Sequence, residues 1–139
     1  MFSYFLLFGK PEPELRLEEF DAVTLLDQIL GEQAADLMSR GYTVEICRQR
    51  KKGVICVDVA HLCRVFDNLF SNVLKYADPA YPVCIQTEQR DRQLYIRMSN
   101  RIRSGTGQVE SSKIGLQTCQ KLLLAMGGQF RQERSRDSF

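Results

Sequence analysis

The sequence predicts an α+β fold of two layers, in which a mainly antiparallel sheet carries its helices on one face. Two observations predict it. Apolar residues recur at helical spacing after Asp21, after Asp58 and from about residue 114. Between these stretches lie short β-branched or apolar runs in adjacent pairs, which favours hairpins. With 139 residues, 44% of them hydrophobic, and a net charge of +2, the chain fits one domain with a real core.

In the first half of the chain, capping and turn residues mark where the expected elements begin and end. Residues 14–17 are compatible with a short strand. Asp21 is a suitable N-cap for a helix to about residue 40, which Gly41 ends. Strands over residues 42–49 and 54–57 are then expected to form a hairpin that turns at Gly53. Asp58 opens a second helix that ends near residue 77, because Pro79 disfavours helix before it.

The second half repeats this alternation. Residues 83–88 and 94–98 predict another hairpin. Residues 99–113 have no hydrophobic period and are rich in Ser, Gly and Arg, and a loop of about this length in a compact domain is more often functional than accidental. A last helix is expected over about residues 114–126, ended by Gly127 and Gly128, and a strand begins at residue 129.

Composition excludes several classes of function. The basic residues cluster at 48–52 and 97–103 without interleaved aromatic residues, which argues against a nucleic-acid surface. Five cysteines without a CxxC pair indicate reduced thiols, and a single histidine, His61, argues against zinc. The apolar residues 1–8 are too short to span a bilayer and lack the basic start of a signal peptide; they are interpreted as the tail of a helix.

The second helix carries an unusual polar stripe opposite its apolar face. The stripe repeats at helical spacing and consists of Arg64, Asn68, Ser71, Asn72 and Lys75. A carboxamide oxygen can bind Mg²⁺, which keeps water and phosphate oxygens in its shell, and a lysine one turn away can meet a phosphate. The alternative is an ordinary solvated helix face.

Two further segments could contact an anionic ligand. Ser112, Lys113 and Gly115 lead into the last helix, whose free N–H groups and positive dipole end suit an anion, although Ser112 could simply cap the helix. Asn100 follows a strand beside the long loop, where its side chain could read the edge of a base or only form a turn.

Together these segments resemble the ATP-binding domain of sensor histidine kinases, a fold shared with gyrase and the Hsp90 chaperones (the Bergerat fold). Residues 68–76, Asn-Leu-Phe-Ser-Asn-Val-Leu-Lys-Tyr, resemble the family's N box, with Val73 for the usual alanine. Residues 114–116 and the later Gly127-Gly128 resemble the second glycine box and its sequel. The resemblance extends from about Leu15 to Phe130.

The resemblance implies ATP and Mg²⁺ as cofactors and a role for each matched residue. Asn72 would bind the metal with Asn68 beside it, Lys75 would contact phosphate, Tyr76 would flank the adenine or ribose, and Asn100 would read the adenine amino group. The phosphates would be received by Ser112, Lys113, Ile114, Gly115 and Leu116. Two departures stand out: Asn100 replaces the aspartate of the first glycine box, and Lys113 replaces a glycine of the second.

The resemblance also implies partners and a division of the chain. His61 has neither an acidic neighbour nor a proline downstream, so the phosphoacceptor histidine is expected on a separate dimerisation domain of the same protein. Residues 1–13 would then be the tail and linker of that helical region, and residues 14–139 the catalytic domain without its last strand. A response regulator is the expected partner, nucleic acid is not, and the domain is expected to be a cytoplasmic part of a protein anchored to the membrane elsewhere.

Two alternatives remain open. A degenerate, non-catalytic module could use the fold for docking within a signalling complex, as the altered glycine boxes suggest. A serine kinase of the same fold would need an acidic base in the second helix. Asp67 lies there, but off the stripe that carries Asn68 and Asn72.

Overall fold

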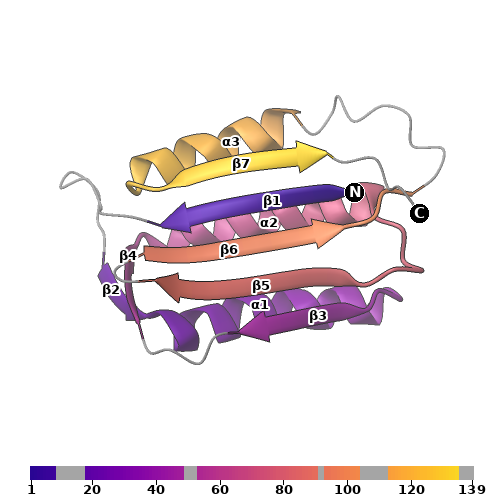
Figure 1. Cartoon of the computed structure of the whole chain (residues 1–139), viewed down its shortest axis with the longest axis horizontal. Coiled ribbons are helices and arrows are strands. Elements are labelled where there is room, and N and C mark those ends of the chain that lie inside the picture. Colours follow the sequence, from indigo (N-terminus) through magenta and orange to yellow (C-terminus); the bar gives the residue numbers. More distant parts are fainter. Residues whose placement is uncertain (9–17, 49–52, 91–92, 104–112, 135–139) are drawn as a thin grey trace.

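The computed structural model describes residues 1–8, 18–48, 53–90, 93–103 and 113–134 and shows a two-layer α+β fold. Five strands form a mixed sheet in the order β3-β5-β6-β1-β7, with β1 at Phe2–Phe8, β3 at Val44–Arg48, β5 at Val83–Arg90, β6 at Gln93–Asn100 and β7 at Gln129–Arg134. Three helices cover one face: α1 (Ala22–Ser39), α2 (Val59–Tyr76) and α3 (Lys113–Ala125) (Figure 1). The predicted fold class is confirmed.

The helices begin and end where the sequence predicts. The Asp21 side chain accepts a hydrogen bond from the N–H of Val23 at the start of α1, and Asp58 accepts one from the N–H of His61 at the start of α2. Gly41 after α1 and Gly127 after α3 have φ angles of 92° and 76°, in the left-handed region that favours glycine. A Cβ atom on the next residue, Gly128, would collide with the backbone carbonyl of Leu7.

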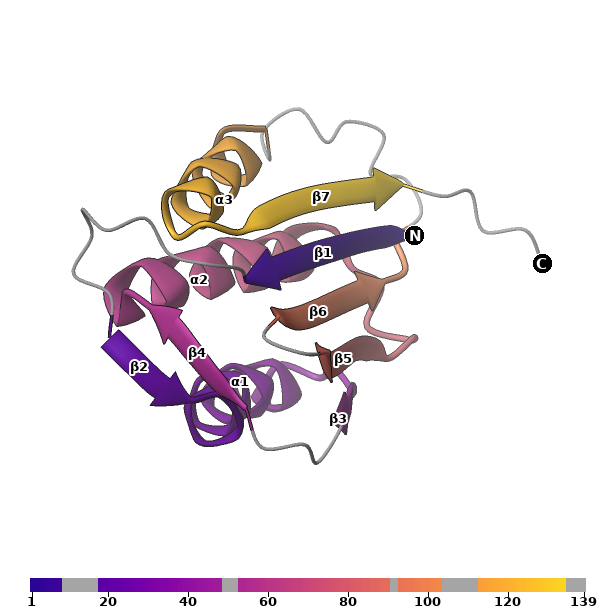
Figure 2. The same ribbon diagram turned by 60° about the vertical axis from the view of Figure 1, so that its left-hand side comes forward.

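The first predicted hairpin is wrong. Strand β3 pairs in parallel with β5, Val44 opposite Val83, and therefore belongs to the large sheet. Strand β4 (Val54–Val57) pairs instead with β2 (Glu18–Asp21) in a separate antiparallel sheet of two strands, which Figure 2 shows beside α1. The second predicted hairpin, β5 with β6, is confirmed by an antiparallel register from Cys84 opposite Ser99 to Arg90 opposite Gln93. The strand expected at residues 14–17 lies outside the described residues.

Residues 1–8 were interpreted as the tail of a helix, but residues 2–8 form the strand β1 in the interior of the sheet. Strand β1 pairs antiparallel with β6 on one side and with β7 on the other, so Leu6 lies between Ile96 and Phe130. Its inward side chains are almost fully buried: Phe2, Tyr4, Leu6 and Phe8. An apolar run of this length is typical of a strand buried on one face and partly covered on the other.

The core lies between the sheet and the helices. Helix α2 crosses its centre and buries Leu62, Phe66, Leu69 and Val73, each no more than 1% exposed. Helix α3 adds Cys119, Leu123 and Met126. Met38, near the end of α1, is exposed. No helix within the described residues is both long and apolar enough to cross a membrane.

Candidate functional site

The polar stripe of α2 is not uniformly open to solvent. Lys75 and Ser71 are exposed, Asn68 is half-buried, and Asn72 is buried with 5% of its surface exposed. The difference arises because one edge of the stripe turns toward α3 and β1. The asparagines therefore lie at the junction of three elements rather than on a free helix face.

Asn72 lies against the strand that the sequence analysis did not place in the sheet. Burial raises the pKa of the Tyr4 hydroxyl well above its usual range, and the nearby Asn72 side chain partly offsets this rise. The Nδ2 atom of Asn72 is itself buried without a well-formed hydrogen bond among the described residues. Leaving such a donor unpaired is costly, so it marks a place where a further group would be stabilising.

Asn68 faces helix α3. Its side chain lowers the pKa of the Cys119 thiol, but burial has the larger effect and raises that pKa to about 11. Cys119 donates through its Sγ to the carbonyl oxygen of Val65, 3.7 Å away. The middle of α3 is thereby fixed relative to the middle of α2.

Tyr76 ends α2 and is buried with 6% of its surface exposed. Its ring meets that of Phe2 edge-on. Phe2 in turn lies opposite Asn100 in the register of β1 with β6. Thus the structure brings Tyr76 and Asn100 to the same end of the sheet, as their expected roles around one nucleotide base require.

Asn100 closes strand β6 and is 2% exposed. Its Nδ2 donates to the carbonyl oxygen of Arg101 at 3.3 Å, while its Oδ1 is buried without a partner among the described residues. A buried acceptor of this kind matches a donor such as an exocyclic amino group.

The residues expected around the phosphates are described only in part. Ser112 lies outside the described residues. The backbone of Lys113, Ile114 and Gly115 forms the first turn of α3, and Leu116 is half-buried against the core. The first N–H groups of a helix lack partners within the helix, so this turn can bind an anion.

The remaining candidate groups have structural roles. His61 forms part of the N-terminal turn of α2, with Nδ1 3.6 Å from Oδ1 of Asp58. The five cysteines are free thiols. No group of three or more His, Cys, Asp or Glu side chains among the described residues could hold a metal ion.

Two contributors to the site were missed by the sequence analysis. Phe2 and Tyr4 lie beneath Tyr76 and Asn72, although their run was interpreted as helical. Arg103, which lies within a segment interpreted as loop, donates to carbonyl oxygens at the end of α2. The aromatic and β-compatible composition of residues 2–8 was the available signal for the strand.

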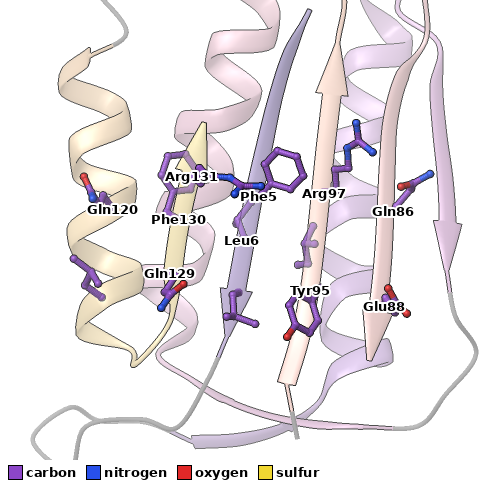
Figure 3. A pocket seen from close by; sticks show the side chains of 13 residues that line it. Phe5, Leu6, Gln86, Glu88, Tyr95, Arg97, Gln120, Gln129, Phe130 and Arg131 are labelled. Carbon is purple, nitrogen blue, oxygen red and sulfur yellow. The ribbon is translucent and has the colours of Figure 1, made fainter. Parts of the chain in front are cut away.

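The structure also has a hollow of about 670 Å³, lined by strands of the large sheet and by Gln120 and Leu124 of α3 (Figure 3). At its centre the Phe5 ring lies between the guanidinium groups of Arg97 and Arg131, whose Cζ atoms are 5.4 Å and 4.6 Å from the ring centroid. None of the predicted site residues lines this hollow. The hollow is therefore separate from the candidate site.

Comparison with known proteins concerns the family and the fold of the chain. No protein-family model matches the chain. The sequence is similar to the sensor histidine kinase YrkQ of Bacillus subtilis, with 34% identity over 131 residues, which make up 94% of this chain and 30% of that protein. The chain thus spans less than a third of the length of this curated relative.

Solved structures of histidine kinases share the fold. The histidine kinase AdeS of Acinetobacter baumannii superposes with a TM-score of 0.61 and 14% identity over 86% of this chain and 66% of that chain. The catalytic domain of the histidine kinase ThkA superposes with a TM-score of 0.59 and 14% identity, over 77% of this chain and 80% of that chain. The mycobacterial sensor histidine kinase MprB superposes with a TM-score of 0.55 and 20% identity, over 80% of both chains. The chain therefore has the fold of a histidine kinase catalytic domain, and the resemblance carried by its motifs is confirmed.

Proposed function

We propose that this chain is the ATP-binding catalytic domain of a two-component sensor histidine kinase, which transfers the γ-phosphoryl group of ATP to a histidine on a separate domain. The proposal extends the shared fold and the similarity to YrkQ, which covers 30% of that protein, to an activity. It concerns residues 14–139 together with β1, the strand that completes the sheet.

One observation supports the proposal most strongly. Only three side-chain atoms among the described residues are buried polar atoms without a hydrogen-bond partner, and two of them belong to Asn72 and Asn100. An unsatisfied buried group costs roughly 1–3 kcal/mol. At Asn100 a ligand with a donor group would remove this cost, and at Asn72, whose side chain also lies near Tyr4, an acceptor such as a phosphate oxygen would do so.

The residues present fit a magnesium nucleotide. Asn72, with Asn68 beside it, would supply a carboxamide oxygen as a ligand for Mg²⁺, and phosphate oxygens and water would complete the coordination shell. When bound, the metal would neutralise charge on the phosphates. The Oδ1 atom of Asn100 would accept a hydrogen bond from the adenine amino group.

The chain's own residues would mainly bind and orient. Lys75 is exposed in the last turn of α2 and would meet a phosphate as a point charge, and the backbone N–H groups of residues 113–116 would bind phosphate oxygens. Phosphoryl transfer depends chiefly on such positioning and needs little covalent chemistry from the protein. The nucleophile would be an imidazole on the dimerisation domain, because His61 is engaged at the start of α2.

The same proposal includes the partners and place of the whole protein. The phosphoacceptor domain would pass the phosphoryl group to a response regulator. The catalytic domain would act in the cytoplasm, and other parts of the protein would anchor it to the membrane.

The experiment is a calorimetric titration of the chain with ATP, with Mg²⁺ and again with a chelator present. The proposal predicts stoichiometric binding that weakens when the metal is removed. Adding labelled ATP and the histidine-bearing domain should then give a phosphoprotein that is labile in acid and stable in base. Acid-stable phosphate would instead indicate a serine kinase.

A non-catalytic docking module is a second candidate, favoured by the deep burial of Asn72 beside Tyr4. A metal ligand that is only 5% exposed must become accessible before it can bind. Absence of binding at millimolar ATP and Mg²⁺ would support this module. The serine kinase is less favoured, because the Oδ1 atom of Asp67 accepts a hydrogen bond from Nε2 of Gln33 on α1 at 2.7 Å.

A further inference from the structure

The end of strand β6 is tied to the end of helix α2 by a short antiparallel ladder. The N–H of Arg103 donates to the carbonyl oxygen of Tyr76 at 2.7 Å, and the N–H of Asp78 donates to that of Arg101 at 2.9 Å. Between these bonds, Ala77 and Ile102 form a β-bridge. The ladder joins the two segments that carry Tyr76 and Asn100.

The side chain of Arg103 reinforces this ladder. Its Nη2 donates to the carbonyl oxygens of Leu74 and Ala77 at 3.4 Å and 3.3 Å. The last carbonyls of a helix have no partners within the helix and carry the negative end of its dipole, so a guanidinium group there is stabilising. Both contacts are made by the same nitrogen, Nη2, so they depend on where the guanidinium group lies.

A buried tyrosine completes the arrangement from a third direction. Arg103 also donates through Nη2 to the hydroxyl of Tyr42 at 3.3 Å, and that hydroxyl donates to the carbonyl oxygen of Ala77 at 3.4 Å. Tyr42 is 8% exposed and precedes β3. Arg103 therefore holds a fixed place relative to the packed core, although its own side chain is exposed.

The ladder determines which way Asn100 points its carboxamide. The carbonyl oxygen of Arg101 accepts both the N–H of Asp78 and the Nδ2 of Asn100. Because a carbonyl can only accept, the Asn100 atom that faces it must be the nitrogen. The Oδ1 atom is left as a buried acceptor without a partner among the described residues.

We propose that Arg103 is a positioning residue that holds the ladder between residues 76–78 and 101–103 and so presents Oδ1 of Asn100 as an acceptor for the amino group of a nucleotide base. The inference rests on the proposed function, since it concerns recognition of that same nucleotide. Arg103 would act through Arg101 and Asn100 and would not touch the nucleotide.

The test compares ATP with inosine triphosphate, which has an oxygen acceptor in place of the adenine amino group. In the unaltered chain, Oδ1 of Asn100 should favour ATP. Arg103→Met removes the guanidinium group but keeps the length of the side chain. We expect the ratio of the affinities for ATP and inosine triphosphate to fall by about tenfold, which corresponds to the loss of one hydrogen bond. Arg103→Lys keeps the positive charge but replaces the guanidinium group with an ammonium group, and it should retain part of the preference for ATP.

The matched control is Arg40→Met, which removes an exposed arginine at the end of a different helix, α1, where it pairs with Asp36. This variant should leave the preference unchanged. A merely structural role for Arg103 would lower the unfolding temperature and weaken both nucleotides equally. An unchanged ratio in Arg103→Met would therefore overturn the inference while the proposed function stands.

Amide hydrogen exchange without nucleotide separates the two claims. If Arg103 holds the ladder, Arg103→Met should accelerate exchange at the N–H groups of Asp78 and Arg103 by about tenfold or more, and Arg40→Met should not. Unchanged exchange would overturn the inference whether or not the chain binds nucleotide. A chain that binds neither nucleotide would refute the proposed function and the recognition role together, even if the ladder depended on Arg103.

Discussion

The rings of Phe2 and Tyr76 meet edge-on, with centroids 6.3 Å apart and planes inclined by 76°. This contact joins the second residue of the chain to the last residue of α2. Edge-to-face pairs contribute about 0.5–1.5 kcal/mol beyond the area they bury. Strand β1 is therefore a support for the candidate site as well as part of the sheet.

The position of β1 predicts that two adjacent leucines differ in their contribution to stability. Leu6 is 1% exposed and faces the helices, whereas Leu7 is half-buried on the other face. Leu6→Ala should lower the free energy of unfolding by about 2–5 kcal/mol, and Leu7→Ala by about 1 kcal/mol. Urea denaturation of both variants tests this. Equal losses would contradict the strand assignment.

The helices could be predicted because their signals are local. Asp21 and Asp58 cap them, Gly41 and Gly127 end them, and apolar residues at a period of 3.6 define their inward faces. The polar stripe could be recognised for the same reason, since Asn68, Asn72 and Lys75 lie on a single helix.

The sheet order could not be predicted because strand pairing is not local. Proximity in sequence suggested that β3 pairs with β4, yet β3 pairs in parallel with β5, which follows after the whole of α2. A terminal apolar run likewise carries no sign of its partners. The burial of Asn72 depends on β1, so the sequence indicated its identity as a site residue but not its surroundings.

Asn72→Ala should abolish Mg²⁺-dependent binding of ATP while leaving the fold intact. The substitution removes the carboxamide proposed to hold the metal. It also removes a buried donor without a partner, so the loss of stability should be small, about 1 kcal/mol or less. The measurement is the shift in unfolding temperature caused by ATP with Mg²⁺. Ser71→Ala, the exposed neighbour, should retain the full shift, and a full shift in Asn72→Ala would refute the metal role.

Asn100→Leu should separate stability from binding. Leucine has nearly the same shape and leaves no buried oxygen without a partner, so the free energy of unfolding should be unchanged or rise by about 1 kcal/mol. ATP affinity should fall about tenfold or more, because the acceptor for the adenine amino group is lost. Calorimetric titration and urea denaturation measure the two effects.

Gln89 provides the matched control for this substitution. Its Oε1 is the third buried polar atom without a partner among the described residues, but it lies on β5, away from the asparagines. Gln89→Leu should therefore be neutral or stabilising and should leave ATP affinity unchanged. Equal losses of affinity in the two variants would place the effect on the fold rather than on Asn100.

The buried thiol of Cys119 predicts how stability depends on pH. Burial raises its pKa from 9.0 to about 11 in the folded chain. The unfolded thiol therefore loses its proton first, so this contribution is fully present below about pH 9 and is lost as the pH rises to about 11, by roughly 2–3 kcal/mol. The raised pKa of Tyr4 acts in the same direction at higher pH.

Cys119→Ser tests this dependence, because a serine hydroxyl does not titrate in this range and can still donate to the carbonyl oxygen of Val65. The free energy of unfolding, measured by urea between about pH 8 and about pH 10.5, should fall less steeply in this variant than in the unaltered chain. Cys47→Ser changes an exposed thiol and should keep the original slope. The slope that remains in Cys119→Ser should fall further when Tyr4→Phe is added. Identical slopes in all variants would show that neither group loses its hydration on folding, and thus that α3 and β1 do not pack against α2 as described.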